Sequence, residues 1–162
     1  MKSWDQRTHE VAYLLNPAFC GRLLYATIKE YEHKAQHAFP FPLVYLVLPL
    51  VLHKQTRSRI NSRTHLLQWI QINQYLLIGF SKRAHELVII TNEALELLLH
   101  SGVIQFTPNG ELSIIDSSKK LSKRHFIDHE IYECIVKSEH VARWFVRAGK
   151  IETIYIGLGV RP

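Results

Sequence analysis

The sequence predicts a mainly α-helical protein with a small β-hairpin, in which a winged helix-turn-helix-like core carries additional N- and C-terminal helices. Three observations lead to this class. Apolar residues recur at three- and four-residue steps along most of the chain, as in amphipathic helices. Two short β-rich runs flank an Asn-Gly pair at residues 109–110, which is a strong hairpin signal. Residues 43–52 are apolar apart from one tyrosine hydroxyl and should form the most buried helix.

Length and composition indicate one compact domain over residues 1–162, because 47% hydrophobic and 21% charged residues are ordinary for a globular protein. The apolar run is too short to cross a bilayer, and the first residues are polar, so neither a membrane anchor nor a secretory leader is visible. We therefore expect a cytoplasmic protein. Its expected parts are an N-terminal helical part (1–53), a winged-helix-like part (62–115) and C-terminal helices with an apolar tail (119–162).

The N-terminal part should begin with a short amphipathic helix over residues 4–15. Asn16 and Pro17 mark the start of a stronger helix, because asparagine is a good N-cap and proline suits the first helical position. Apolar residues repeat at helical spacing from there to about Lys34, where a polar run begins.

The most buried helix should lie within residues 39–53. Pro42 fits its first turn, and Pro49 should kink or end it about two turns later, because proline lacks the helical hydrogen-bond donor. A helix that is apolar on every side must be covered on every side. We expect the flanking segments to pack around it.

The middle of the chain should start with a loop, because residues 54–63 are basic and lack a clear period. Helices should follow at about 62–73 and 82–90. A third helix should begin with Thr91 as its N-cap and end at Gly102, a typical left-handed residue after a helix.

Three helices followed by a hairpin is the element order of a winged helix-turn-helix, which occurs in DNA-binding and in protein-docking modules. In a DNA reader, the third helix should present Arg, Lys, Asn or Gln to base edges. Its outward residues here are Glu93, Glu96 and His100, and the two acidic side chains would repel phosphates. We therefore expect a module that contacts protein, or DNA backbone without sequence preference.

The C-terminal part should hold two helices, about 122–138 and 139–148, with Gly149 ending the second. The tail over 151–162 is apolar for a terminus, so we expect it to be docked, either in the core of this chain or in a partner. The candidate partner-docking residues of the whole chain are Glu93, Glu96, His100, Trp144, Tyr155, Leu158 and Val160.

The net charge of +6 is unevenly distributed. No acidic residue lies between Glu32 and Glu86, whereas several cations do, and a second basic group lies at 119–124. Such groups attract phosphate backbones or acidic protein surfaces, and they are also typical of an ordinary solvated surface. The candidate nucleic-acid or acidic-surface contacts are Lys54, Arg57, Arg59, Arg63, Lys82, Arg83, Lys119, Lys120, Lys123 and Arg124.

Motifs that would carry chemistry are not found in the sequence, and we expect no enzyme, cofactor or metal site. His125 and His129 are four residues apart, but zinc needs three or four converging ligands and neither HExxH nor paired CxxC is present. No Gly-rich phosphate loop and no GxSxG occur. Cys20 and Cys134 are far apart in the sequence, and we expect reduced, inert thiols.

Four phrases together resemble a known family. They are Asn-Pro-Ala-Phe-Cys at 16–20, Pro-Phe-Pro-Leu-Val-Tyr-Leu-Val-Leu-Pro-Leu-Val-Leu-His at 40–53, Arg-Trp-Phe-Val-Arg-Ala-Gly at 143–149 and Leu-Gly-Val-Arg-Pro at 158–162. They are similar to the middle component of bacterial three-component ABC systems, a group that includes the small subunit of Lamassu-type anti-phage defence.

The resemblance implies a non-enzymatic adaptor without a catalytic motif. Its partners would be an ABC ATPase that resembles the chromosome-maintenance (SMC) and double-strand-break-repair ATPases, and an effector that is often a nuclease. The small subunit would bridge or restrain the two. By analogy with winged-helix subunits of chromosome-maintenance complexes, it would dock on the ATPase head or the neck of its coiled coil.

Two alternatives from other classes remain open. A free-standing winged-helix transcription regulator would form a symmetric dimer that protects a defined DNA site. A metal-dependent hydrolase using His125 and His129 would carry bound zinc.

Overall fold

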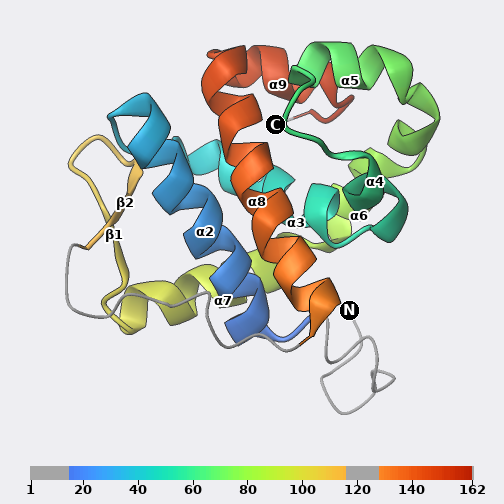
Figure 1. The fold of residues 1–162 in the computed structure, drawn as a ribbon. Coiled ribbons are helices and arrows are strands. Elements are labelled where there is room, and N and C mark those ends of the chain that lie inside the picture. Colours follow the sequence, from blue (N-terminus) through green and yellow to red (C-terminus); the bar gives the residue numbers. More distant parts are fainter. Residues whose placement is uncertain (1–14, 116–127, 162) are drawn as a thin grey trace.

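The described fold is centred on helix α2 (Pro17–Ala35), which packs along both α7 (Val88–His100) and α8 (His129–Ala148). In this computed structural model, which describes residues 15–115 and 128–161, α2 and α8 run side by side (Figure 1). The expected helix over 4–15, except for its last residue, and the basic group at 119–124 lie outside the described residues.

Local signals set both ends of α2. The Asn16 side chain accepts a hydrogen bond of 2.8 Å from the Ala18 N–H, and Pro17 occupies the first helical position. The helix ends where Gln36 adopts a left-handed conformation with φ of 60°. The predicted start is confirmed, and the predicted end at about Lys34 is correct to one residue.

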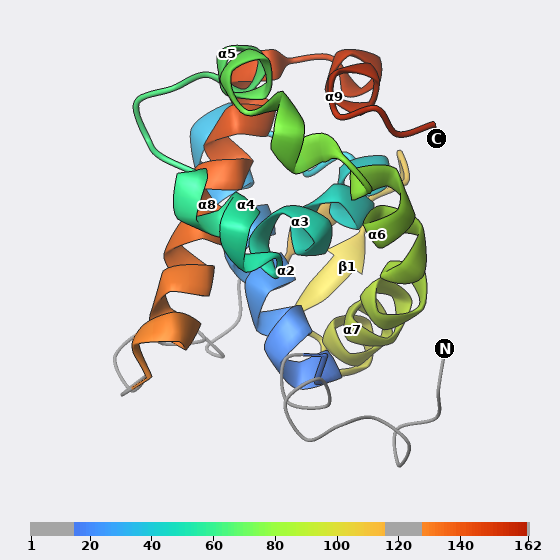
Figure 2. The ribbon, with the colours of Figure 1, turned by 90° about the vertical axis from the view of Figure 1, so that its right-hand side faces the viewer.

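The apolar run forms a 3₁₀ turn η2 (Phe41–Leu43) and helix α3 (Val44–Val51), in which seven of the eight residues are buried. Figure 2 shows α3 between α4 and α8 on one side and α6 on the other, and α3 packs against all three. Pro49 lies inside the helix, which ends two residues later. The prediction of a fully covered helix that stops shortly after Pro49 is confirmed.

The predicted loop at 54–63 is wrong in its first half, because α4 (Lys54–Arg59) is helical. His53 caps it: its Nδ1 lies 2.8 Å from the Thr56 hydroxyl and accepts from the Thr56 N–H at 3.4 Å. Arg57, in the middle of α4, is 1% exposed and pairs with α8. The helix therefore depends on contacts that are distant in sequence, which local periodicity does not show.

Three further elements lead to α7: α5 (Leu66–Ile72), the 3₁₀ turn η3 (Gln74–Leu77) and α6 (Phe80–Glu86). The break between the last two predicted helices lies at Leu87, so the prediction of Thr91 as an N-cap is wrong. The buried Thr91 hydroxyl donates to the Leu87 carbonyl at 2.8 Å, which satisfies the hydroxyl inside a helix.

The predicted hairpin is confirmed, with β1 (Ile104–Phe106) antiparallel to β2 (Leu112–Ile114). It follows α7 directly because Gly102, at φ of 64°, lets the Gly102 and Val103 N–H groups turn back onto the carbonyls of the last turn of α7. Phe39 pairs with the outer side of β2 through two backbone hydrogen bonds of 2.8 Å with Leu112.

The winged-helix-like core is not confirmed. Helix α5 packs against α8 and α9 (Ile151–Gly157), whereas α7 packs along α2. The middle helices therefore pack against helices from the N-terminal and C-terminal parts of the chain. Only their order along the sequence matches that of a winged helix.

The C-terminal part differs from the prediction of two helices that meet at residue 138, because α8 is continuous. Ser138 is buried, and its hydroxyl donates to the Cys134 carbonyl at 2.9 Å. Gly149 ends α8 as predicted, with φ of 76°. The tail then forms α9 and docks in the core of this chain, where the Tyr155 hydroxyl donates to the Pro42 carbonyl at 2.5 Å.

Within residues 15–115 and 128–161, none of the helices has both the length and the apolar character needed to cross a membrane.

Candidate protein-binding groove

The sequence-predicted basic residues are not brought together as one surface. Lys54, Arg59 and Arg63 are exposed on α4 and the turn after it. Lys82 is exposed on α6, where its Nζ lies 4.0 Å from a Glu86 carboxylate oxygen. Lys119, Lys120, Lys123 and Arg124 lie outside the described residues.

Arg57 differs from the other cations because its guanidinium is directed into the protein. It donates to Glu130 at 2.5 Å and to Glu133 at 3.1 Å, both on α8, and to the Val51 carbonyl at 3.0 Å. A fourth bond of 3.3 Å goes to the Leu52 carbonyl. The guanidinium is thus occupied by internal partners, and Arg57 ties α4 to α8 instead of facing a phosphate.

The predicted docking residues are divided between core and surface. Trp144, Tyr155 and Leu158 are buried in the core of this chain, and the Trp144 indole donates to the Thr64 carbonyl at 2.7 Å. Val160 is half-buried. The three residues on α7 share one outer side: Glu93 is half-buried, and Glu96 and His100 are exposed.

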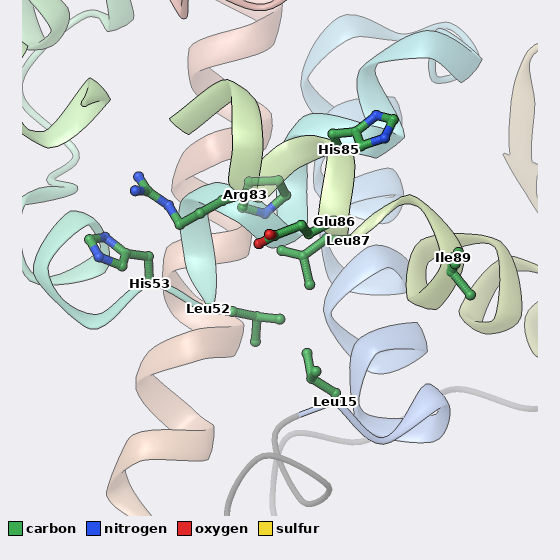
Figure 3. Close-up of a pocket in the computed structure, with 9 residues that line it drawn as sticks. Leu15, Leu52, His53, Arg83, His85, Glu86, Leu87 and Ile89 are labelled. Carbon is green, nitrogen blue, oxygen red and sulfur yellow. The ribbon is translucent and has the colours of Figure 1, made fainter. Parts of the chain in front are cut away.

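A groove with a cavity volume of about 640 Å³ opens between the C-terminal end of α3 and the junction of α6 with α7 (Figure 3). Its volume lies in the range typical of ligand pockets. The residues that line it are Leu15, Pro49, Leu52, His53, Arg83, His85, Glu86, Leu87 and Ile89.

The lining residues lie where helices begin or end. Helix α3 ends just beyond Pro49, which leaves Leu52 half-buried and places His53 at the cap of α4. Leu87 separates α6 from α7, so both helices contribute side chains to the groove. Leu15 enters from the residue just before the cap of α2.

The described part of the groove lining contains one carboxylate, that of Glu86, and one guanidinium, that of Arg83. The two terminal nitrogens of Arg83 donate to the Ile78 carbonyl at 3.2 Å and the Leu76 carbonyl at 3.0 Å, and the guanidinium lies over the Phe80 ring. Its Nε–H is buried and has no hydrogen-bond partner among the described residues. Burial lowers the pKa of Arg83, because removing the guanidinium from water disfavours its charged form.

His53 lies on the same side of the groove as Arg83, with the Glu86 carboxylate between them and Ile89 (Figure 3). Burial lowers the pKa of His53, and the positive charges of Arg83 and Arg57 lower it further. Among the described residues, the ion pair within 4.0 Å of Glu86 is with Lys82, and none joins a carboxylate to Arg83.

Chemically, the groove is suited to binding. It combines five apolar side chains with a few polar groups, which is the usual composition of a recognition site. The described residues contain no group of three His, Cys, Asp or Glu that could hold a metal ion. Both thiols are buried in helices α2 and α8, and burial is the main cause that raises the pKa of Cys20 to about 12 and of Cys134 to about 11.

Of the groove residues, the sequence singled out only Arg83 as a candidate contact. The apolar members and His53 were missed as site residues because they come from separate helices that meet only in the folded chain. The available signal was the run that ends at His53, where a fully apolar segment is followed at once by polar residues.

Fold and groove together define a small, mainly helical protein with a candidate binding groove. The family model of the ABC-three component (ABC-3C) system Middle Component 3 matches residues 4–162, and the chain belongs to this family. It is therefore a component of a three-component ABC system and works with the other components of that system. Searches of curated proteins and of solved structures gave no match.

Proposed function

We propose that this protein is the non-enzymatic adaptor subunit of an anti-phage defence complex of the Lamassu type. It bridges an SMC-like ABC ATPase and an effector subunit, often a nuclease, in the cytoplasm. The observation that carries this proposal is the family match over residues 4–162, because a middle component is by definition part of a larger system.

The geometry supports an adaptor through the groove between α3 and the α6–α7 junction. Apolar side chains at a surface are stabilised when a partner covers them, and the groove leaves Ile89 half-exposed and Leu52 and Leu87 half-buried. A protein that acts by holding partners needs such surfaces and needs no reactive group.

DNA backbone contact is a further part of the proposal. Lys54, Arg59 and Arg63 are exposed on one short stretch of chain, and no acidic residue occurs in the sequence from 33 to 85. Cations of this kind bind phosphates without sequence preference and with strong salt dependence.

Co-purification tests the adaptor. With a tag on this chain, co-expression with the ATPase and the effector should give one complex that elutes together in size-exclusion chromatography. If this chain elutes alone and monodisperse while neither partner follows it, the proposal is wrong. Turnover of any substrate by the purified chain alone would contradict the non-enzymatic part.

A further inference from the structure

We propose that residues 1–14 of this chain occupy the groove in the isolated protein, with Trp4 and Val11 against its apolar lining. These residues lie outside the described part of the chain. Their attachment point, their sequence and their tether to the groove select them as the occupant. The proposal goes beyond the adaptor function because it concerns the chain without its partners. Another component that binds the groove in the assembled system would take the place of this segment.

The segment is attached to the chain inside the groove. Leu15 is the first described residue, its side chain belongs to the lining, and it packs against the core. Figure 3 shows Leu15 next to Leu52 and Leu87, at the end of the groove opposite His85. Consecutive Cα atoms are about 3.8 Å apart, so the segment begins beside these apolar side chains.

The sequence of the segment provides a matching apolar face. In the amphipathic helix expected for this part of the chain, Trp4 and Val11 precede Leu15 by eleven and four residues, so the three share one face. That face continues from the side chain that already lines the groove. Arg7 falls near the same face, and the exposed Glu86 carboxylate in the lining provides it with an opposite charge.

The covalent attachment favours this segment over a free occupant. A separate molecule that binds the groove loses translational and rotational freedom, at a cost of about 4–15 kcal/mol. A segment joined at Leu15 avoids most of this cost, because its docking is intramolecular. Helix formation in water is close to neutral per residue, so side-chain burial decides the balance. Full burial of a side chain such as Val11 contributes about 1.5–3 kcal/mol.

Charge does not oppose this occupant. The described lining holds one guanidinium and one carboxylate, so it selects neither a strongly acidic nor a strongly basic occupant. The segment carries Lys2 and Arg7 against Asp5 and Glu10, so its side-chain charges also balance. A second copy of this chain carries the same net charge of +6, so the two molecules repel each other.

Acrylamide quenching of tryptophan fluorescence in the full chain tests the docking. Trp69 and Trp144 are each 1% exposed, so they are shielded whether or not the segment docks. The contribution of Trp4 is the difference between a chain and the same chain with Trp4→Phe. We expect Trp4 of the native protein to be quenched at least threefold less than Trp4 of the urea-unfolded chain.

Two matched variants test the groove side of the contact. Ile89 is 50% exposed in the lining, and Leu97 is 40% exposed on α7 outside the lining. Ile89→Glu places a charge against the apolar face of the segment and should raise the quenching of Trp4 at least threefold. Leu97→Glu should change it less than twofold. Both positions are exposed, so both variants should fold.

Two further variants test the segment side. Val11 shares the expected apolar face with Trp4, whereas His9 lies on the opposite face of the same helix. Val11→Asp should raise the quenching of Trp4 at least threefold, because the new carboxylate would lose its water on docking. His9→Asp adds a carboxylate to the solvent side and should change the quenching less than twofold.

Three results would each overturn the inference: native Trp4 quenched as strongly as in the unfolded chain, equal effects within either pair of variants, or shielding of Trp4 that is lost on dilution. The last result would show that the segment of a second copy fills the groove. The docked segment and the adaptor can fail separately. Quenching uses the isolated chain, so an accessible Trp4 leaves co-elution of the three components unaffected. Components that do not co-elute would refute the adaptor and leave the shielding of Trp4 unaffected.

Discussion

The internal role of Arg57 is tested by the substitution Arg57→Ala. The guanidinium joins α4 to Glu130 and Glu133 of α8 and also bonds the carbonyls that end α3. Removing it separates three elements at once, and it leaves those carbonyls without this donor in a buried place.

The expected loss of unfolding free energy depends on whether the former partners of Arg57 can find another hydrogen-bond donor. Breaking a buried ion pair costs about 3–5 kcal/mol. The side chains of Glu130 and Glu133 are 50% and 33% exposed, so water can replace the lost donor on both carboxylates. We therefore expect the lower end, about 3 kcal/mol of unfolding free energy, or about 6–12 °C in Tm for a chain of this length.

Urea unfolding followed by tryptophan fluorescence measures this loss, because Trp69 and Trp144 are buried with ring centroids 5.1 Å apart. The matched control is Arg59→Ala, at an exposed position on the same helix, which should cost less than about 0.5 kcal/mol. Equal losses for the two variants would refute the internal role of Arg57. The same holds if Arg57→Ala weakens DNA binding without any loss of stability.

Three further predictions concern buried groups of the described core. Cys20 and Cys134, with pKa values of about 12 and about 11, should react with a thiol reagent at pH 8 only after unfolding in urea; rapid reaction of the native protein would contradict their burial. Burial, with Arg143 and Lys137, lowers the pKa of His140 from 6.5 to about 4, so the unfolded state binds more protons between these values and stability falls as pH drops through them. Urea denaturation at pH 7 and pH 4.5 measures this fall in the unfolding free energy. The fall should be about 2 kcal/mol smaller in His140→Gln than in the wild type, and an equal fall in both proteins would contradict the prediction. Tyr155→Phe removes the bond to the Pro42 carbonyl and should lower the unfolding free energy by about 1 kcal/mol; no change in the urea midpoint would show that the bond contributes nothing to docking of α9.

Elements with local signals were predictable from the sequence. A helix end or a chain reversal is predictable where residues within one turn of it determine the conformation. This holds for the start of α2 at Asn16 and Pro17, for the positive-φ glycines at 102 and 149, and for the Asn-Gly turn. The apolar run was predictable as the buried helix because its composition alone excludes an exposed face.

Elements that depend on distant contacts were not predictable. Helix α4 requires glutamates more than 70 positions away to neutralise Arg57, and a basic stretch without them is typical of a loop. The continuity of α8 and the helical placement of Thr91 depend on hydroxyls that bond to the preceding turn, where the same residue types also serve as caps. The groove gathers residues from 15, 49–53 and 83–89, so no single window of sequence contains it.

The most direct measurement of the adaptor role is the association of the ATPase with the effector, with and without this chain. Purified tagged ATPase and effector would be mixed at fixed concentrations, and the effector retained on the ATPase would be quantified. We predict that the effector is retained only when this chain is added. Ile89→Glu puts a charge into the apolar lining of the groove and should reduce retention, whereas Leu97→Glu, at an exposed position of α7 outside the lining, should not. Equal retention of the effector in the absence of this chain would contradict the adaptor role.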